Sequence, residues 1–299
     1  MLVKFPAMLS PEIMRRLSQI GREPPVQRLG VTTLVTKFVA NKPLRGQSLC
    51  ASSMLPVGRE VANSAGKHWL VEKKLTEIVP HVPQRIVPQP CADEMSDLHP
   101  DLGSLAASFP SQTLIVDLET CGFAGSMVFL VGVLHEASGE LVIHQLLARS
   151  YAEERAVFAS FWELTVGRRV LVTFNGKSFD WPVVRDRSTL HRLQATEFPA
   201  THCDLLHHAR RAWKDRLPNC KLQTLERFVC GRNRVGDIPG SEIPAAYHDF
   251  VRTADAWLIR SILHHNALDL ITSLELSLRL MRGKNATLPN GATGQVLTL

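Results

Sequence analysis

Residues 112–120 read Gln-Thr-Leu-Ile-Val-Asp-Leu-Glu-Thr, a short apolar run that ends in two acidic residues. The apolar residues 114–116 favour a β-strand, in which successive side chains point to opposite faces. Asp117 and Glu119 are therefore expected on one face of the strand and Leu118 on the other. Two adjacent carboxylates repel each other unless a cation lies between them, and hard divalent ions such as Mg²⁺ prefer oxygen ligands. Taken alone, this stretch favours a strand that runs into an acidic loop over a metal site.

Composition sets the general class of the protein. The chain has 299 residues with 45% hydrophobic and 21% charged residues, which suits one large domain or two small ones. The net charge of +6 is compatible with a polyanionic partner without requiring one. The six cysteines include no CxxC pair, so neither a zinc ribbon nor a disulfide framework is indicated, and reduced thiols in the cytoplasm are the simplest interpretation. Charges near the N-terminus argue against a signal peptide, and no apolar run is long enough to predict a membrane helix.

Proline density predicts the domain organisation. Six prolines between residues 79 and 110 predict a linker or wrapped arm, because proline interrupts regular elements. Residues 1–109 are therefore expected to form an N-terminal extension and linker of unclear role, with a turn-rich structural flap and short strand at 56–71. The expected domain covers residues 110–283, and residues 284–299 are expected to be a disordered tail.

The hydrophobic pattern of the expected domain predicts an α/β sheet layered with helices. The expected strands are 112–118, 127–134, 141–147 and 170–174, followed by a segment at 201–214 that begins extended and becomes helical. The expected helices are 151–166, one that begins near 178 or 179, two short ones at 221–230 and 244–252, and a long one at 255–281.

Two further acidic motifs follow the first. Asp180 ends the sequence Asn-Gly-Lys-Ser-Phe-Asp after the strand at 170–174. Asp269 ends His-His-Asn-Ala-Leu-Asp in the last helix, where His265 is one turn away and shares its face. Aspartates rarely lie in apolar surroundings without a partner. Alone, the last motif indicates a His–Asp hydrogen bond on a helix face.

In this order the three motifs resemble those of the DEDD-type 3′–5′ exonuclease superfamily, over about residues 110–282. The first is Asp-x-Glu, the second is Asn, spacers, Phe and Asp, and the third is a Tyr or His four or five residues before an Asp. The segment His-Cys-Asp-Leu-Leu that contains Asp204 looks like the YprB-like branch of predicted exonucleases. The resemblance implies a ribonuclease-H-like mixed β-sheet flanked by helices, here with an irregular N-terminal extension.

The resemblance also implies a site and its cofactors. Asp117, Glu119, Asp180 and Asp269 would hold two Mg²⁺ or Mn²⁺ ions, which suit phosphodiester hydrolysis. His265 is the preferred general base because it shares a helix face with Asp269, although His264 fits the spacing of the His form.

Several residues are candidates for contacts with single-stranded DNA or RNA ends, each with a plainer alternative. Asn175 either orients the second motif or stops the strand, and Lys177 either contacts a phosphate or is solvated. Arg210, Arg211 and Lys214 belong to a basic cluster that either follows a phosphate backbone or forms a solvated face. Asp204 is either a supporting carboxylate or a helix cap. Arg232 and Arg234 are weaker phosphate-contact candidates.

The leading hypothesis is a metal-dependent 3′–5′ exonuclease, a hydrolase acting on nucleic-acid ends. One alternative is a structure-specific endonuclease on the same fold, and another is a non-catalytic nucleic-acid-binding module. The oligomeric state and the choice between DNA and RNA are left open by the sequence.

Overall fold

A computed structural model of the chain describes residues 55–79, 98–122, 126–193 and 197–282. The strands are β1 (Arg59–Asn63), β2 (Gly66–Lys74), β3 (Thr113–Thr120), β4 (Val128–Ala137), β5 (Glu140–Leu147), β6 (Val170–Thr173) and β7 (Thr201–Asp204). They form one mixed sheet in the order β1-β2-β5-β4-β3-β6-β7, in which β3, β6 and β7 are parallel and the other neighbours are antiparallel. The predicted mixed α/β fold is confirmed.

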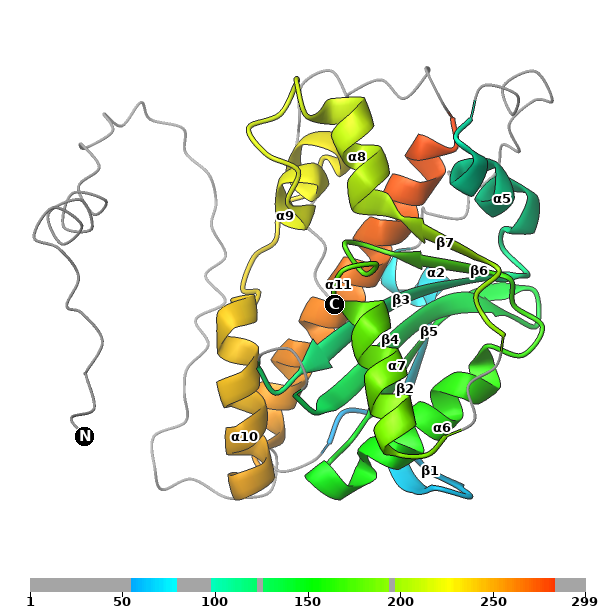
Figure 1. Ribbon diagram of the computed structural model, residues 1–299. Coiled ribbons are helices and arrows are strands. Elements are labelled where there is room, and N and C mark those ends of the chain that lie inside the picture. The colour runs from blue at the N-terminus through cyan, green and yellow to red at the C-terminus, as the bar shows by residue number, and fades with distance from the viewer. Residues whose placement is uncertain (1–54, 80–97, 123–125, 194–196, 283–299) are drawn as a thin grey trace, which may run out of the picture. The chain divides into compact units, whose positions relative to one another are not determined.

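The α-helices surround this sheet (Figure 1). They are α2 (Leu75–Ile78), α5 (Pro100–Ser108), α6 (Glu154–Leu164), α7 (Asp180–Leu190), α8 (Leu205–Trp213), α9 (Leu222–Leu225), α10 (Ile243–Thr253) and α11 (Ala256–Leu280). Short 3₁₀ turns occur at η1 (Tyr151–Glu153) and η3 (Gly240–Glu242), and η2 (Glu226–Cys230) is a π-helical turn. No helix in the described part of the chain is long and apolar enough to cross a membrane.

Two hydrophobic cores lie on opposite faces of the sheet. The neighbouring residues Leu114 and Ile115 of β3 are both fully buried, but they belong to different cores because strand side chains alternate. The core of Leu114 is completed by α6 and α10, and that of Ile115 by α5, α8 and much of α11. Asp117 and Glu119 share the parity of Ile115, so β3 directs them to the face that α11 covers.

The hairpin of β1 and β2 extends the sheet, since β2 pairs with β5 from Trp69–Leu147 to Lys74–Val142. Residues 59–74, which the sequence analysis assigned to the N-terminal extension, therefore share the sheet of the expected domain. Residues 1–54 and 80–97, and the expected tail at 284–299, lie outside the described residues.

The expected linker also contains a helix, α5. Pro100 occupies its first turn, where a missing N–H costs nothing, and the His99 side chain accepts a hydrogen bond from the Asp101 N–H at 3.2 Å. The expectation that prolines exclude regular structure throughout 79–110 was therefore wrong for this segment. Proline interrupts helix interiors but favours helix starts.

A close approach between α11 and the sheet depends on Gly132. This glycine of β4 lies opposite Asp117 of β3, and a Cβ atom there would be 2.1 Å from the side-chain oxygen of Asn266. Such a separation is a severe overlap, so a larger residue would force α11 away from the strands.

We predict that Gly132→Ala lowers the free energy of unfolding by about 1–3 kcal/mol, as overpacked cores do. Urea unfolding of the full chain measures this. A Cβ atom added at Gly103 in α5 would meet no heavy atom within 4 Å, so Gly103→Ala is the matched control. It should stabilise the protein by about 0.5–1 kcal/mol through helix propensity. Equal stability of Gly132→Ala and the unaltered protein would contradict the described packing.

Candidate functional site

Asp117 is fixed by a contact between β3 and α11. The Asn266 side-chain amide donates to the Asp117 carboxylate at 2.8 Å and approaches the Asp117 carbonyl at 3.3 Å. The Asn266 oxygen accepts a hydrogen bond from the Gln145 amide at 2.9 Å, and that amide also donates to the Leu263 carbonyl at 2.7 Å. Asn266 and Gln145 are fully buried. This chain of hydrogen bonds joins α11 to β3 and β5.

Asp180 is positioned by the turn that joins β6 to α7. The Asp204 carboxylate accepts hydrogen bonds from the N–H groups of Asn175 at 2.8 Å and Lys177 at 3.0 Å. Asn175 has a φ of 65°, a left-handed conformation that asparagine tolerates better than most residues. A Cβ at Gly176 would lie 2.4 Å from the Thr173 hydroxyl and 2.8 Å from the Asp180 carboxylate. The Asn-Gly pair therefore allows the tight turn that brings Asp180 beside the strand end.

Asp204 acts as a helix cap and as a loop anchor. Besides the two turn N–H groups, it accepts a hydrogen bond from the Leu206 N–H at 3.1 Å at the start of α8. Its side chain is fully buried, so these donors replace the water that the carboxylate gives up. The two alternatives for Asp204, a cap or a supporting carboxylate, are thus both compatible with its contacts.

His265 and Asp269 lie one turn apart on α11. The Nδ1 atom of His265 is 2.9 Å and 3.0 Å from the two oxygens of Asp237, and its Nε2 is 3.6 Å from Asp269. Asp237 can only accept, so Nδ1 carries the proton in this pair. Burial lowers the pKa of His265, but the hydrogen bond to Asp237 and the charges of Asp269 and Glu119 outweigh burial and raise it.

His264 has a different environment. Burial lowers the pKa of His264, and no described hydrogen bond joins its ring to Asp237 or Asp269. Of the two histidines that the sequence left open, His265 is the one whose ring contacts the acidic residues.

The carboxyl groups influence one another electrostatically. Burial raises the pKa of Glu119 to about 8, with Asp269 and Asp180 adding to the shift. Burial raises the pKa of Asp180 to about 7, helped by Asp204 and Asp269. Burial and the charges of Asp269, Glu119 and Asp180 also raise the pKa of Asp117 well above its usual value. Their side chains are partly open to solvent, yet protein surrounds them closely. Asp269 thus lies within electrostatic range of the other three predicted carboxylates.

Arg234 partly compensates this negative charge. Its guanidinium forms ion pairs with Glu226, with Asp237 at 3.1 Å and with Asp269. Burial alone would lower the pKa of Arg234, but Asp269 and Glu226 raise it further than burial lowers it. A polar cavity of about 320 Å³ lies beside this arginine, and its lining includes Arg227, Arg232 and Asp237.

Asp237 and Asn266 were not expected as site residues. Asp237 follows a glycine in a segment without periodicity, so no pattern in the sequence links it to His265. Asn266 adjoins His265 in the third motif, and this position was the available signal. Arg234 was expected as a weak phosphate-contact candidate, but here it pairs with carboxylates.

The expected nucleic-acid contacts are divided between the turn before Asp180, which holds Asn175 and Lys177, and the end of α8. Lys177 places its ammonium 3.4 Å from Asp101 of α5. Arg210 and Arg211 are exposed in the last turn of α8, and Lys214 follows them. In the part of the chain that the structure describes, no hydrogen bond or ion pair joins these three residues to the four carboxylates. Their role in binding nucleic acid stays a prediction.

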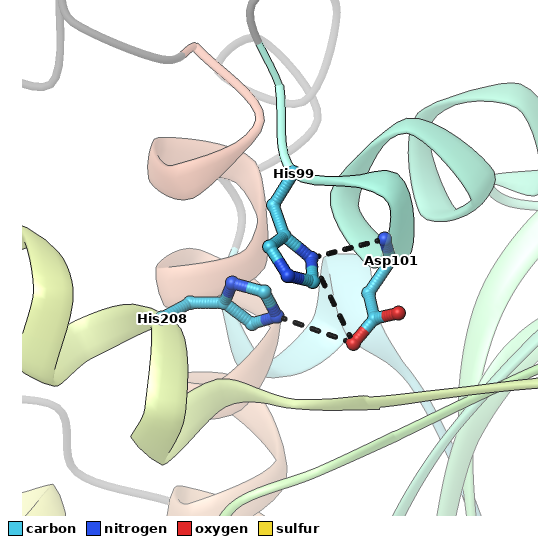
Figure 2. A group of neighbouring side chains, drawn as sticks. All are labelled: His99, Asp101 and His208. Carbon is cyan, nitrogen blue, oxygen red and sulfur yellow. Dashed lines mark hydrogen bonds and ion pairs between the residues drawn. The ribbon is translucent and has the colours of Figure 1, made fainter.

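A second group of possible metal ligands lies between α5 and α8. His99, Asp101 and His208 each offer a donor atom, and these atoms all lie within 4.8 Å of one another (Figure 2). Among the described residues, the four carboxylates do not meet this spacing. Two ions about 4 Å apart would spread their ligands more widely than one ion does. The wider spacing is therefore compatible with a two-ion site.

A family model described as the RNase H superfamily matches residues 114–281, from β3 to α11. The chain belongs to the RNase H superfamily. All four carboxylates and His265 lie inside this superfamily match. The prediction of a ribonuclease-H-like domain is therefore confirmed.

The uncharacterized protein YprB of Bacillus subtilis (strain 168) is 35% identical to this superfamily member over 170 residues. The matched region is 56% of this chain and 41% of YprB, so the chain spans less than half the length of that relative. This similarity bears out the predicted YprB-like branch. A family B DNA polymerase from the hyperthermophilic archaeon Pyrobaculum calidifontis is similar in structure with a TM-score of 0.45 and 18% identity, over 57% of this chain and 25% of the polymerase.

We predict that the metal-free protein loses stability as the pH rises from about 6.5 to about 8. The folded state keeps protons on Glu119 and Asp180, whose pKa values are about 8 and about 7, while the unfolded chain releases them. Buried histidines with lowered pKa values take up protons on unfolding below about pH 6.5. They make stability rise with pH in that lower range and so do not oppose the predicted loss above it. Urea unfolding in EDTA measures the slope. Glu119→Gln should flatten it, and stability that rises across this range would contradict the described electrostatics.

Proposed function

We propose that this chain is a metal-dependent nuclease, and in particular a 3′–5′ exonuclease that hydrolyses phosphodiester bonds at single-stranded DNA or RNA ends. The observation that carries the proposal is the cluster of Asp117, Glu119, Asp180 and Asp269 at the end of β3, where each of the first three has its pKa raised by burial and neighbouring carboxyl groups. Membership of the RNase H superfamily supports the nuclease class. A cytoplasmic location stays a prediction.

The residues of this cluster fit hard divalent cations. All four donors are carboxylates, the ligand type that Mg²⁺ and Mn²⁺ prefer. One arginine pairs with Asp269 and one amide donates to Asp117, which leaves the cluster short of positive charge. Two bound ions would supply an activated water and stabilisation of the leaving 3′ oxygen.

The protein residues would contribute orientation and proton transfer. Asp237 holds the Nδ1–H of His265, so the Nε2 atom is the free proton acceptor on the side of Asp269. A histidine in this tautomer can take a proton from an attacking water near neutral pH. Asn266 fixes one oxygen of Asp117 and leaves the other available. The turn around Gly176 sets the position of Asp180.

The order of the motifs supports exonuclease action through the resemblance to DEDD-type exonucleases. The Asp-x-Glu pair lies on β3, Asp180 at the start of α7 and Asp269 on α11, and this order is what the DEDD resemblance implies. A structure-specific endonuclease would use the same residues, so only the choice of substrate distinguishes an exonuclease from an endonuclease. A binding module without catalysis would gain nothing from a carboxylate cluster that repels a polyanion.

We predict that Asp117→Asn lowers the rate of hydrolysis of an end-labelled oligonucleotide at least about a hundredfold in Mg²⁺ or Mn²⁺, a loss of roughly 3 kcal/mol in transition-state stabilisation. The fold should be retained, because the pKa of Asp117 is already raised and Asn keeps its size. Asp249→Asn is the matched control, since the exposed Asp249 carboxylate pairs with the exposed Arg252.

A circular single strand completes this test. An exonuclease degrades the linear oligonucleotide and leaves the circle intact, whereas cleavage of the circle would identify an endonuclease. Full activity of Asp117→Asn, or tight binding without turnover by the unaltered protein on DNA and RNA with both metals, would refute the proposal.

We predict that His265→Gln lowers kcat much more than His264→Gln does, because the His265 ring is the one that contacts Asp237 and Asp269. Asp237→Asn should lower kcat by about 10–100-fold, as removal of an orienting partner does. Steady-state kinetics on the linear oligonucleotide measure all three variants. Equal losses in the two histidine variants would show that neither ring acts as the base.

A further inference from the structure

Two helices from distant parts of the chain bring two imidazoles and a carboxylate together. His99 caps α5, Asp101 lies in its first turn, and His208 lies on α8. Asp101 Oδ2 is 3.9 Å from His99 Nδ1 and 3.7 Å from His208 Nε2. Figure 2 shows both rings turned toward this oxygen. Both distances are too long for hydrogen bonds. His99 Nδ1 instead accepts the capping hydrogen bond from the Asp101 N–H at 3.2 Å, and an ion bound at Nδ1 would replace this bond.

The donor set is one that first-row transition ions prefer. Two imidazole nitrogens and one carboxylate oxygen bind Zn²⁺ at about 2.0–2.2 Å, which places neighbouring ligand atoms about 3.4 Å apart in a tetrahedron. The observed separations exceed this by only a few tenths of an ångström for the two pairs with Asp101. His208 is 3% exposed, which limits the directions that its ring can take. A small adjustment of the exposed His99 ring would close the group around one ion.

Two neighbouring cationic side chains, Lys177 and Arg211, could instead stabilise this cluster. Both would have to move if a metal ion bound there. Lys177 Nζ lies 3.4 Å from Asp101 Oδ2, and an Arg211 guanidinium nitrogen lies 3.5 Å from His208 Nδ1. Both residues are exposed. Lys177 forms an ion pair with Asp101, and the Arg211 contact lies at the upper limit for a hydrogen bond. Exposed contacts of this kind contribute far less than coordination of a transition ion.

We propose that His99, Asp101 and His208 bind one transition-metal ion of the Zn²⁺ type, separate from the carboxylate cluster, and that this ion ties α5 to α8. The fourth ligand is water, since the described chain offers three. Binding displaces Lys177 from Asp101. The backbone of Lys177 is held by Asp204 in the turn before Asp180, so the freed ammonium remains next to the second motif. The proposal does not depend on nuclease activity.

The experiment uses the full chain, stripped with EDTA and titrated with Co²⁺, whose visible absorption reports low-coordinate binding by imidazole and carboxylate. This absorption should saturate at one equivalent and disappear when Zn²⁺ displaces the Co²⁺. Asp101→Asn, His99→Gln and His208→Gln should each weaken Co²⁺ binding more than about tenfold, since loss of even an outer-shell partner costs that much. Asp249→Asn is the control for a lost surface charge.

Asp117→Asn separates the two sites. The proposal predicts that this variant keeps the Co²⁺ absorption, because its carboxylate belongs to the other cluster. Loss of the absorption in Asp117→Asn, with retention in Asp101→Asn, would assign the ion to the carboxylates and overturn the proposal. Absence of saturable absorption in the folded, unaltered protein would overturn it as well. Circular dichroism checks folding, and Asp101→Asn and His99→Gln remain informative if the buried His208→Gln variant unfolds.

Discussion

The hydrogen bond from Asn266 to Asp117 is the contact on which the arrangement of the site depends. It joins the longest helix to the strand that carries the first acidic pair, with the amide 2.8 Å from the carboxylate. Gly132 makes the approach possible, and the Gln145 amide donates to the Asn266 oxygen. An unsatisfied polar group at this depth would cost about 1–3 kcal/mol, so the contact specifies one position of the helix over the sheet.

This position of α11 determines where the other acidic residues lie. Asp269 is one turn beyond His265 on α11. The rotation of α11 about its axis that places Asn266 over Asp117 therefore also brings His265 and Asp269 toward the end of β3. Burial and the resulting repulsion raise the pKa of Asp117, and the arginine paired with Asp269 compensates only part of the repulsion. A cluster with this excess of negative charge is stabilised by cations, and the same charge would oppose a bare phosphate backbone. Metal binding and substrate binding are therefore coupled in the proposed nuclease.

Much of the fold could be predicted from the sequence, but the contacts among site residues could not. Alternation placed Asp117 and Glu119 on one face of a strand, and helical spacing placed His265 beside Asp269, because both are local periodicities. The partnership of Asp237 with His265 is a tertiary contact between a turn and a helix, which no local pattern encodes. The same holds for the pairing of β2 with β5, since a short turn-rich segment gives no signal of the strand that it joins. Asp101 and His208 are likewise brought together only by the fold.

A crystal structure of the full chain with Mn²⁺ and a phosphorothioate single-stranded oligonucleotide tests the central claim most directly. The account predicts two anomalous Mn²⁺ peaks about 4 Å apart, bounded by Asp117, Glu119, Asp180 and Asp269, with the scissile phosphate between the ions and the His265 ring. Asn266 should keep its hydrogen bond to Asp117. Oligonucleotide bound without Mn²⁺ at these carboxylates, or Mn²⁺ bound only elsewhere in the protein, would contradict the account.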